Sequence, residues 1–171
     1  GQASKATPLG ASAKFQSAGK KTQRKDLGRQ MMTYGNVYVA QVAMGASPAQ
    51  LLKALTEAAA YPGPSIVIAY TPCISHGIRA GMSCAQEEMK KAVEAGFWTL
   101  YRYNPLNREH PLTIDSKKPA GDYREFLRGE SRFAALEMKF PEIAEDLFSK
   151  AAEDVGKAYR EFLKLEESMK S

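Results

Sequence analysis

In the middle of the chain, stretches whose apolar residues have the spacing of a strand alternate with stretches that have the spacing of a helix. A β-branched run at residues 37–44 predicts a buried strand, and residues 66–70 predict a second one. Between them, Ser47 supplies an N-cap and Pro48 a first-turn proline, so we expect a helix to begin there. The apolar side of this helix would consist of Leu51, Leu52, Leu55, Ala58 and Ala59.

The alternation of helices and strands continues to residue 115. Ser83 is expected to cap a helix that ends at Gly96, with an apolar side formed by Met89, Ala92 and Val93. Residues 97–103 predict a third strand, and residues 112–115 a short fourth strand. Strands joined by helical connections of this length are typical of a parallel sheet with right-handed crossovers.

The two ends of the chain show no strand pattern. Residues 1–25 are polar, glycine-rich and basic and predict a loop, and a short helix is expected from Asp26. Pro141 opens a long final helix. Its apolar stripe consists of Ile143, Leu147, Ala151, Val155, Phe162 and Leu165, and a stripe of this kind must pack against other elements.

We therefore expect an α/β fold in the form of a partial doubly wound parallel sheet with C-terminal helices. The chain divides into a loop and basic segment (1–30), a βαβαβ part (31–115) and a helical segment (116–171). A doubly wound domain has about five or six strands, and buried parallel strands need neighbours on both edges. The pattern thus predicts that the chain is part of a larger domain whose other strands precede Gly1.

Composition places the chain among globular proteins. It has 171 residues, of which 44% are hydrophobic and 25% are charged. The longest apolar run, residues 65–70, is far shorter than the ~18 residues of a membrane span, and we expect neither a membrane segment nor a signal peptide. Two cysteines do not form a disulfide framework, so a reducing, cytoplasmic compartment is expected.

The formal charge of +5 is concentrated at the start of the chain. Residues 1–30 hold seven Lys and Arg residues against Asp26 alone, a formal +6, and the other residues sum to −1. This distribution predicts an anionic neighbour, such as a phosphate, an acidic subdomain or nucleic acid, unless the segment is simply a solvated loop. Nucleic acid is disfavoured because Phe15 is the only aromatic residue in residues 1–30, and because no nucleic-acid motif is present.

Candidate chemistry lies where the second strand ends. Cys73 follows this strand directly, and it is either a core thiol or a reactive or metal-ligating one. His76 is near it, and Cys84 is expected to serve packing at a helix start. The opening loop, with Lys5 close to several small residues, suits a diphosphate although it matches no phosphate-binding motif.

Six blocks of the sequence resemble one enzyme family in the right order. They are residues 1–8 (GQASKATP), 32–40 (MTYGNVYVA), 64–74 (PSIVIAYTPCI), 102–105 (RYNP), 114–117 (IDSK) and 125–130 (EFLRGE). The family is pyruvate:ferredoxin (flavodoxin) oxidoreductase, or pyruvate synthase, and the likeness is to the C-terminal thiamine diphosphate-binding domain of a much longer polypeptide. Residues 81–86 (GMSCAQ) resemble only loosely a glycine-rich turn of that family, so we assign no role to this turn.

The resemblance implies oxidative decarboxylation of pyruvate with coenzyme A to acetyl-CoA and CO2. Electrons would pass through 4Fe-4S clusters to ferredoxin or flavodoxin, and the cofactors would include thiamine diphosphate and Mg²⁺. A related 2-oxoacid:ferredoxin oxidoreductase is the alternative. The resemblance also implies a homodimeric full-length enzyme whose upstream domains contact this chain.

The resemblance assigns roles to three residues of the chain. Gly1 and Gln2 would belong to the cofactor-binding loop, just after the Mg²⁺ ligands of the upstream polypeptide. Cys73 would be the fourth ligand of the proximal cluster, with the other three ligands upstream. The catalytic residues are not assigned, and the chain alone is expected to be inactive.

Overall fold

A four-stranded mixed sheet lies at the centre of the computed structural model, which describes residues 2–170. Its strands are β1 (Tyr38–Val42), β2 (Ser65–Ala69), β3 (Tyr101–Tyr103) and β4 (Leu112–Ile114), in the spatial order β2-β1-β3-β4. The α/β class and the positions of all four predicted strands are confirmed, although β3 is shorter than the predicted run.

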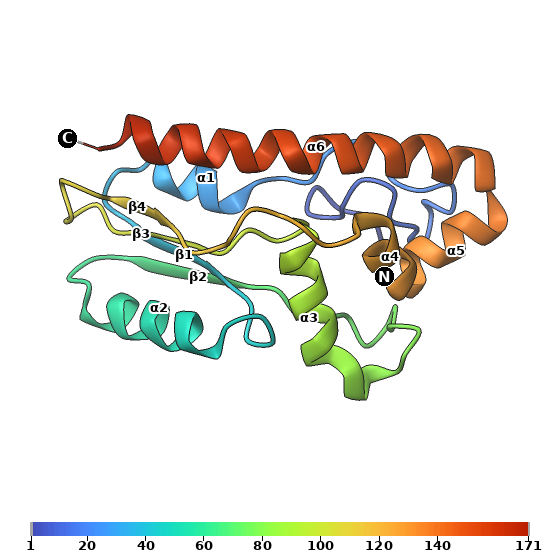
Figure 1. Cartoon of the computed structure of the whole chain (residues 1–171), viewed down its shortest axis with the longest axis horizontal. Coiled ribbons are helices and arrows are strands. Elements are labelled where there is room, and N and C mark those ends of the chain that lie inside the picture. Colours follow the sequence, from blue (N-terminus) through green and yellow to red (C-terminus); the bar gives the residue numbers. More distant parts are fainter. Residues whose placement is uncertain (1, 171) are drawn as a thin grey trace.

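The prediction of a parallel sheet is correct only for β1 and β2. Strand β3 runs antiparallel to β1, and β4 runs antiparallel to β3. The reason is the place of α3 (Ala85–Glu94), which stands beyond the end of the strands instead of returning along a face of the sheet (Figure 1). Because the chain re-enters the sheet from the end at which β1 stops, the next strand must run backward.

Helices cover both faces of the sheet (Figure 1). Alternate residues of β1 point to opposite sides, as the period of a strand requires. On one side, Tyr38, Ala40 and Val42 pack with α2 (Pro48–Ala60). On the other side, Val39 packs in a cluster that includes side chains from α1 (Leu27–Met32) and α6 (Pro141–Ser168).

A second apolar core lies beyond the carboxyl end of β1. It joins α3, α4 (Tyr123–Gly129), α5 (Ser131–Lys139) and the first half of α6, and Leu9 and Ala11 of the opening loop pack into it. The predicted stripe of α6 is confirmed, since Leu147 and Ala151 are buried in this core and Phe162 against the sheet. Within residues 2–170, no helix combines the length and the apolar character that crossing a bilayer requires.

Local capping signals predicted two helix starts correctly and one incorrectly. The side chain of Asp26 accepts a hydrogen bond from the backbone N–H of Arg29 at 2.9 Å, and Ser47 accepts one from that of Gln50 at 3.2 Å. Ser83, however, lies inside a 3₁₀ turn, η1 (Met82–Cys84), and α3 begins only after Cys84.

The predicted apolar side of α2 is also partly wrong. Leu52 and Leu55 are 67% and 48% exposed. Ala54 and Gln50 are the buried residues of this helix, and Leu51 and Ala58 pack at the edge of the same cluster. The helix therefore meets the sheet along a stripe rotated from the one that its leucines indicate.

Candidate functional site

The carboxyl ends of the two parallel strands meet at one place. The backbone N–H of Tyr70 donates to the carbonyl of Val42 at 3.0 Å, and the indole N–H of Trp98 donates to the same carbonyl at 3.0 Å. Just beyond β1, Gly45 passes so close to α3 that a Cβ there would lie 2.0 Å from the Gln86 carbonyl oxygen. Both strand exits are thus held at the edge between the sheet and the second core.

Cys73 is exposed, so the structure contradicts the interpretation as a core thiol. It opens a tight turn in which the Gly77 N–H donates to the Cys73 carbonyl at 2.7 Å. The backbone N–H of His76 lowers the pKa of the thiol below its ordinary value, Ser75 and the charge of Arg132 act in the same direction, and partial burial opposes them. An exposed thiol of this kind is suited to bind metal or to react as a thiolate.

The Cys73 turn is anchored to the junction between α4 and α5. The Tyr70 hydroxyl donates to the carboxylate of Glu130, and Nε of Arg132 donates to the other oxygen of that carboxylate at 2.6 Å. Backbone contacts add to this, since the N–H of Arg79 donates to the Gly129 carbonyl at 2.8 Å. Glu130 is only 4% exposed, so Tyr70, Glu130 and Arg132 form a buried cluster beneath the turn, which we call the Glu130 cluster.

A second buried carboxyl group lies beside this cluster. Glu88 of α3 is 5% exposed, and within residues 2–170 its Oε1 has no hydrogen-bond partner. Burial raises the pKa of Glu88, and the charge of Glu130 raises it further. The carboxyl fits there because residue 129 is a glycine, whose added Cβ would lie 2.6 Å from Glu88 Oε1.

The opening loop is closed around a lysine. The ammonium of Lys20, a residue that is 8% exposed, donates to the carbonyls of Thr7, Lys5 and Gln23 at 2.7, 3.0 and 3.4 Å. Desolvation by burial lowers the pKa of Lys20. At the base of the loop, the Lys25 N–H donates to the Lys5 carbonyl at 2.7 Å. The loop therefore has a defined shape without helix or strand.

Of the two residues proposed for diphosphate binding, the structure describes only Gln2. Gly1 lies outside the described residues, and Gln2 is exposed and bridges to Lys14. The N–H groups of Ser4 and Ala6 are already bound by the Thr7 and Ser4 hydroxyl groups, at 2.9 and 3.1 Å. Those two N–H groups are therefore not free for a phosphate.

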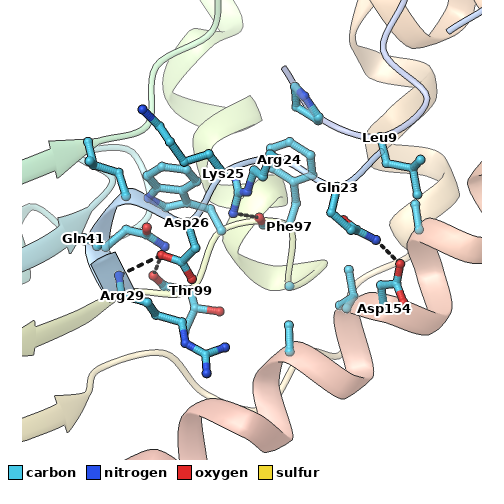
Figure 2. A pocket seen from close by; sticks show the side chains of 18 of the residues that line it. Leu9, Gln23, Arg24, Lys25, Asp26, Arg29, Gln41, Phe97, Thr99 and Asp154 are labelled. Atoms are coloured by element: carbon cyan, nitrogen blue, oxygen red, sulfur yellow. Dashed lines mark hydrogen bonds between the residues drawn. The ribbon is translucent and has the colours of Figure 1, made fainter. Parts of the chain in front are cut away.

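A cavity of about 480 Å³ lies between the end of the opening loop and α6 (Figure 2). The guanidinium of Arg24 lies 4.7 Å from the ring centroid of Trp98 and donates to the carbonyl of Phe97 at 3.1 Å. Figure 2 shows Gln23 reaching across to Asp154 of α6, to which its side-chain amide donates. Cys73 does not line this cavity.

The described residues can supply one thiolate ligand but no complete metal site. In the part of the chain from residue 2 to 170, no three His, Cys, Asp or Glu side chains come together to hold a metal ion. Cys84 is half-buried at the start of α3, where its thiol meets the Ala80 carbonyl at 3.7 Å. Cys73 is thus an exposed thiol, and among the described residues it belongs to no group of three potential metal ligands.

Sequence reasoning missed Glu88, Glu130 and Arg132. Glu130 stands in one of the blocks that resemble the family, but its charge gave no sign of burial, because acidic residues are mostly exposed. The glycine before it, Gly129, leaves space for the carboxyl of Glu88, but a glycine in the sequence does not say which side chain fills that space.

Several known proteins are similar to this chain over nearly its whole length. No protein-family model matches the chain. It is 55% identical over 170 residues to a pyruvate:ferredoxin oxidoreductase of Moorella thermoacetica, covering 98% of this chain, and 51% identical over 168 residues to a pyruvate-flavodoxin oxidoreductase of Klebsiella pneumoniae, covering 96%. A pyruvate dehydrogenase (NADP+) of Cryptosporidium parvum is 47% identical over 84% of the chain, which spans 8% of that protein.

The chain spans 14% of the length of the first two relatives, and it is therefore similar to one part of much longer proteins. About half of the aligned positions are identical, and the aligned stretch covers nearly the whole chain. The chain belongs to the pyruvate-flavodoxin/ferredoxin oxidoreductases, a family of oxidoreductase enzymes.

Proposed function

We propose that this chain is the C-terminal part of a pyruvate:ferredoxin or pyruvate:flavodoxin oxidoreductase and forms part of its thiamine diphosphate-binding domain. The whole enzyme would convert pyruvate and coenzyme A to acetyl-CoA and CO2 and pass the electrons to ferredoxin or flavodoxin. The observation that carries this proposal is the identity of about half of all positions along nearly the entire chain.

In this proposal Cys73 provides one thiolate ligand to a 4Fe-4S cluster, which when bound would carry electrons away from the oxidised substrate. Three observations support the role. The thiol is exposed, its pKa is lowered by backbone N–H groups, and its turn is anchored at both the sheet and the α4–α5 junction. A ligand held so firmly keeps a fixed position relative to the rest of the site.

The opening loop would form a rim of the thiamine diphosphate and Mg²⁺ site. Gly1 and Gln2 are the proposed contacts, and the loop that follows them is fixed in shape by Lys20. The exposed Lys5 side chain adds positive charge beside that rim. The Mg²⁺ ligands, the upstream domains and the second protomer of a homodimer would lie outside this chain, in a cytoplasmic enzyme.

The cluster role is tested with Cys73→Ser in the full-length enzyme. We expect loss of the iron of one cluster and of its electron paramagnetic resonance signal, because a serine hydroxyl is a much poorer ligand for iron than a thiolate. Cys84→Ser is the matched control and is expected to leave the iron content unchanged. An unchanged iron content in Cys73→Ser would contradict the ligand role.

The dependence on the rest of the polypeptide is tested with the 171-residue chain alone. We expect no pyruvate oxidation in the presence of coenzyme A, thiamine diphosphate, Mg²⁺ and an electron acceptor, because the two cysteines of the chain cannot supply the four ligands of a 4Fe-4S cluster. Measurable coenzyme A-dependent turnover by the chain alone would overturn this part of the proposal.

A further inference from the structure

A buried ion pair lies directly beneath the Cys73 turn. Nε of Arg132 and Oε2 of Glu130 are 2.6 Å apart, with side chains that are 18% and 5% exposed. An ion pair that is removed from water is weakly screened, so its two charges act over a longer distance than those of a surface pair.

Three segments that are distant in sequence meet at this pair. Tyr70, at the end of β2, binds Glu130 through its hydroxyl, and Ile78 of the same turn forms an antiparallel bridge with the backbone of Glu130. From the opening loop, the N–H of Ser12 donates to the Arg132 carbonyl at 3.0 Å. The pair therefore stands between the cysteine turn and the loop that we propose for the cofactor site.

Backbone hydrogen bonds join this pair to the turn that opens at Cys73. The N–H of Ser131, the residue between Glu130 and Arg132, donates to the Gly77 carbonyl at 3.2 Å, and the Gly77 N–H donates to the Cys73 carbonyl at 2.7 Å. Glu88 is a further buried carboxyl beside the Glu130 cluster, and burial raises its pKa. Glu130 and Arg132 thus place two opposite charges against the turn that carries Cys73.

We propose that Glu130 and Arg132 are positioning residues that set the electrostatic environment of the group held by Cys73, Arg132 favouring its reduced form and Glu130 its oxidised form. The inference rests on the proposed role of Cys73 as a cluster ligand. Reduction adds an electron and hence negative charge, and nearby charges and hydrogen bonds are the means by which proteins adjust the potential of iron–sulfur groups.

The test is a redox titration of the full-length enzyme, monitored by electron paramagnetic resonance. We expect Arg132→Met to shift the midpoint potential of one cluster to more negative values, because an unpaired Glu130 carboxylate remains. Glu130→Gln is expected to shift the same potential to more positive values, because an unpaired Arg132 remains. The double variant restores neutrality and is expected to return the potential toward that of the unmodified enzyme.

Opposite signs separate a charge effect from structural damage, which would move both single variants in the same direction. Arg128→Met and Glu137→Gln are the matched controls. They alter an exposed pair, with an Nη2–Oε1 distance of 2.9 Å, that also joins α4 to α5, and no shift is expected because solvent screens it. If Glu130→Gln does not fold, the midpoint potentials of Arg132→Lys and Arg132→Met are compared instead. The lysine keeps the positive charge and is expected to keep the potential of the unmodified enzyme, whereas the methionine is expected to shift it.

Two outcomes would overturn the inference while leaving the proposed function intact. The first is that neither Arg132→Met nor Glu130→Gln changes any midpoint potential. The second is that both variants shift the potential with the same sign. In each case Cys73→Ser would still lose the iron of one cluster. If Cys73→Ser keeps all its iron, the cluster role itself fails. The iron content and the sign of the shift thus report on the two proposals separately.

Discussion

Arg102 holds Asp115 by two parallel hydrogen bonds across β3 and β4, with Nε–Oδ2 and Nη2–Oδ1 distances of 2.9 Å each. Nη1 of Arg102 also binds Glu57 of α2 at 2.6 Å, and Glu57 accepts a hydrogen bond from the hydroxyl of Tyr38 at 2.8 Å. The pair therefore ties the antiparallel half of the sheet to the helix that covers its parallel half. Arg102 and Asp115 each stand in one of the sequence blocks that resemble the family.

Replacing Arg102 by Met is expected to lower the free energy of unfolding by about 3–5 kcal/mol, because two carboxylates would lose their buried partner. Chemical denaturation of the chain measures this loss. Arg29→Met, which breaks an exposed ion pair with Glu161, is the matched control and is expected to cost less than about 1 kcal/mol. A similar loss in the two variants would show that the Arg102 network contributes little.

Gly45→Ala is expected to destabilise the chain by about 3 kcal/mol or more, because its Cβ would meet backbone atoms of Gln86 that cannot move aside without displacing α3. Gly156→Ala, inside α6, is the control and is expected to be neutral or stabilising by up to about 1 kcal/mol. Thermal unfolding compares the two variants. Equal stability of Gly45→Ala and the unmodified chain would contradict the close packing of α3 on the β1 exit.

Glu88 makes the stability of the chain depend on pH. Its pKa is raised in the folded state, so the unfolded chain releases this proton at lower pH than the folded chain. The contribution of Glu88 to the free energy of unfolding is fully present below its ordinary pKa of 4.5, where the carboxyl is neutral in both states. This contribution is lost as the pH rises through the higher pKa of the folded state. Glu88→Gln, which cannot ionise, is expected to lose less stability between about pH 4 and about pH 8.

Chemical denaturation of Glu88→Gln and of the unmodified chain across this pH range measures the pH dependence of the free energy of unfolding. Glu87→Gln, one residue earlier on the exposed side of α3, is the control and is expected to follow the unmodified chain. If Glu88→Gln and the unmodified chain change in parallel, the buried carboxyl is not the source of the dependence.

Lys20→Met is expected to loosen the opening loop at a cost of about 2 kcal/mol, since three inward-facing carbonyls would lose their donor. Hydrogen exchange reports the loosening directly, and the amides of Gly10 and Lys25, which bind within the loop, are expected to exchange faster. Lys21→Met removes an exposed charge next to it and serves as the control. Unchanged protection of both amides in Lys20→Met would refute the role of its ammonium.

Most of the secondary structure could be predicted from the sequence because its causes are local. Caps at Asp26 and Ser47, the proline at residue 48 and the β-branched run of β1 act within a few residues. Cys73 could be singled out for the same reason, since it follows a recognisable strand. The amphipathic stripe of α6 likewise predicted burial, although not what covers it.

The direction of β3 could not be read from the chain. A strand has the same alternation of residues whichever way it runs. The packing of α3 against Gly45 and the α4–α5 junction decides from which end of the sheet the chain enters β3. The exposure of Leu52 and Leu55 has a similar origin, because the rotation of α2 is set by its contacts with the sheet, including the buried Gln50.

The sequence by itself thus determined the α/β class, the positions of the four strands and of α1, α2 and α6, the basic opening loop and Cys73 as the residue to examine. The tertiary structure alone decided that the sheet is mixed, that Lys20 closes the loop, and that Glu130 and Arg132 lie against the turn that carries Cys73. Local preferences act between neighbours in sequence, whereas burial of a charge depends on which distant segments exclude water from it.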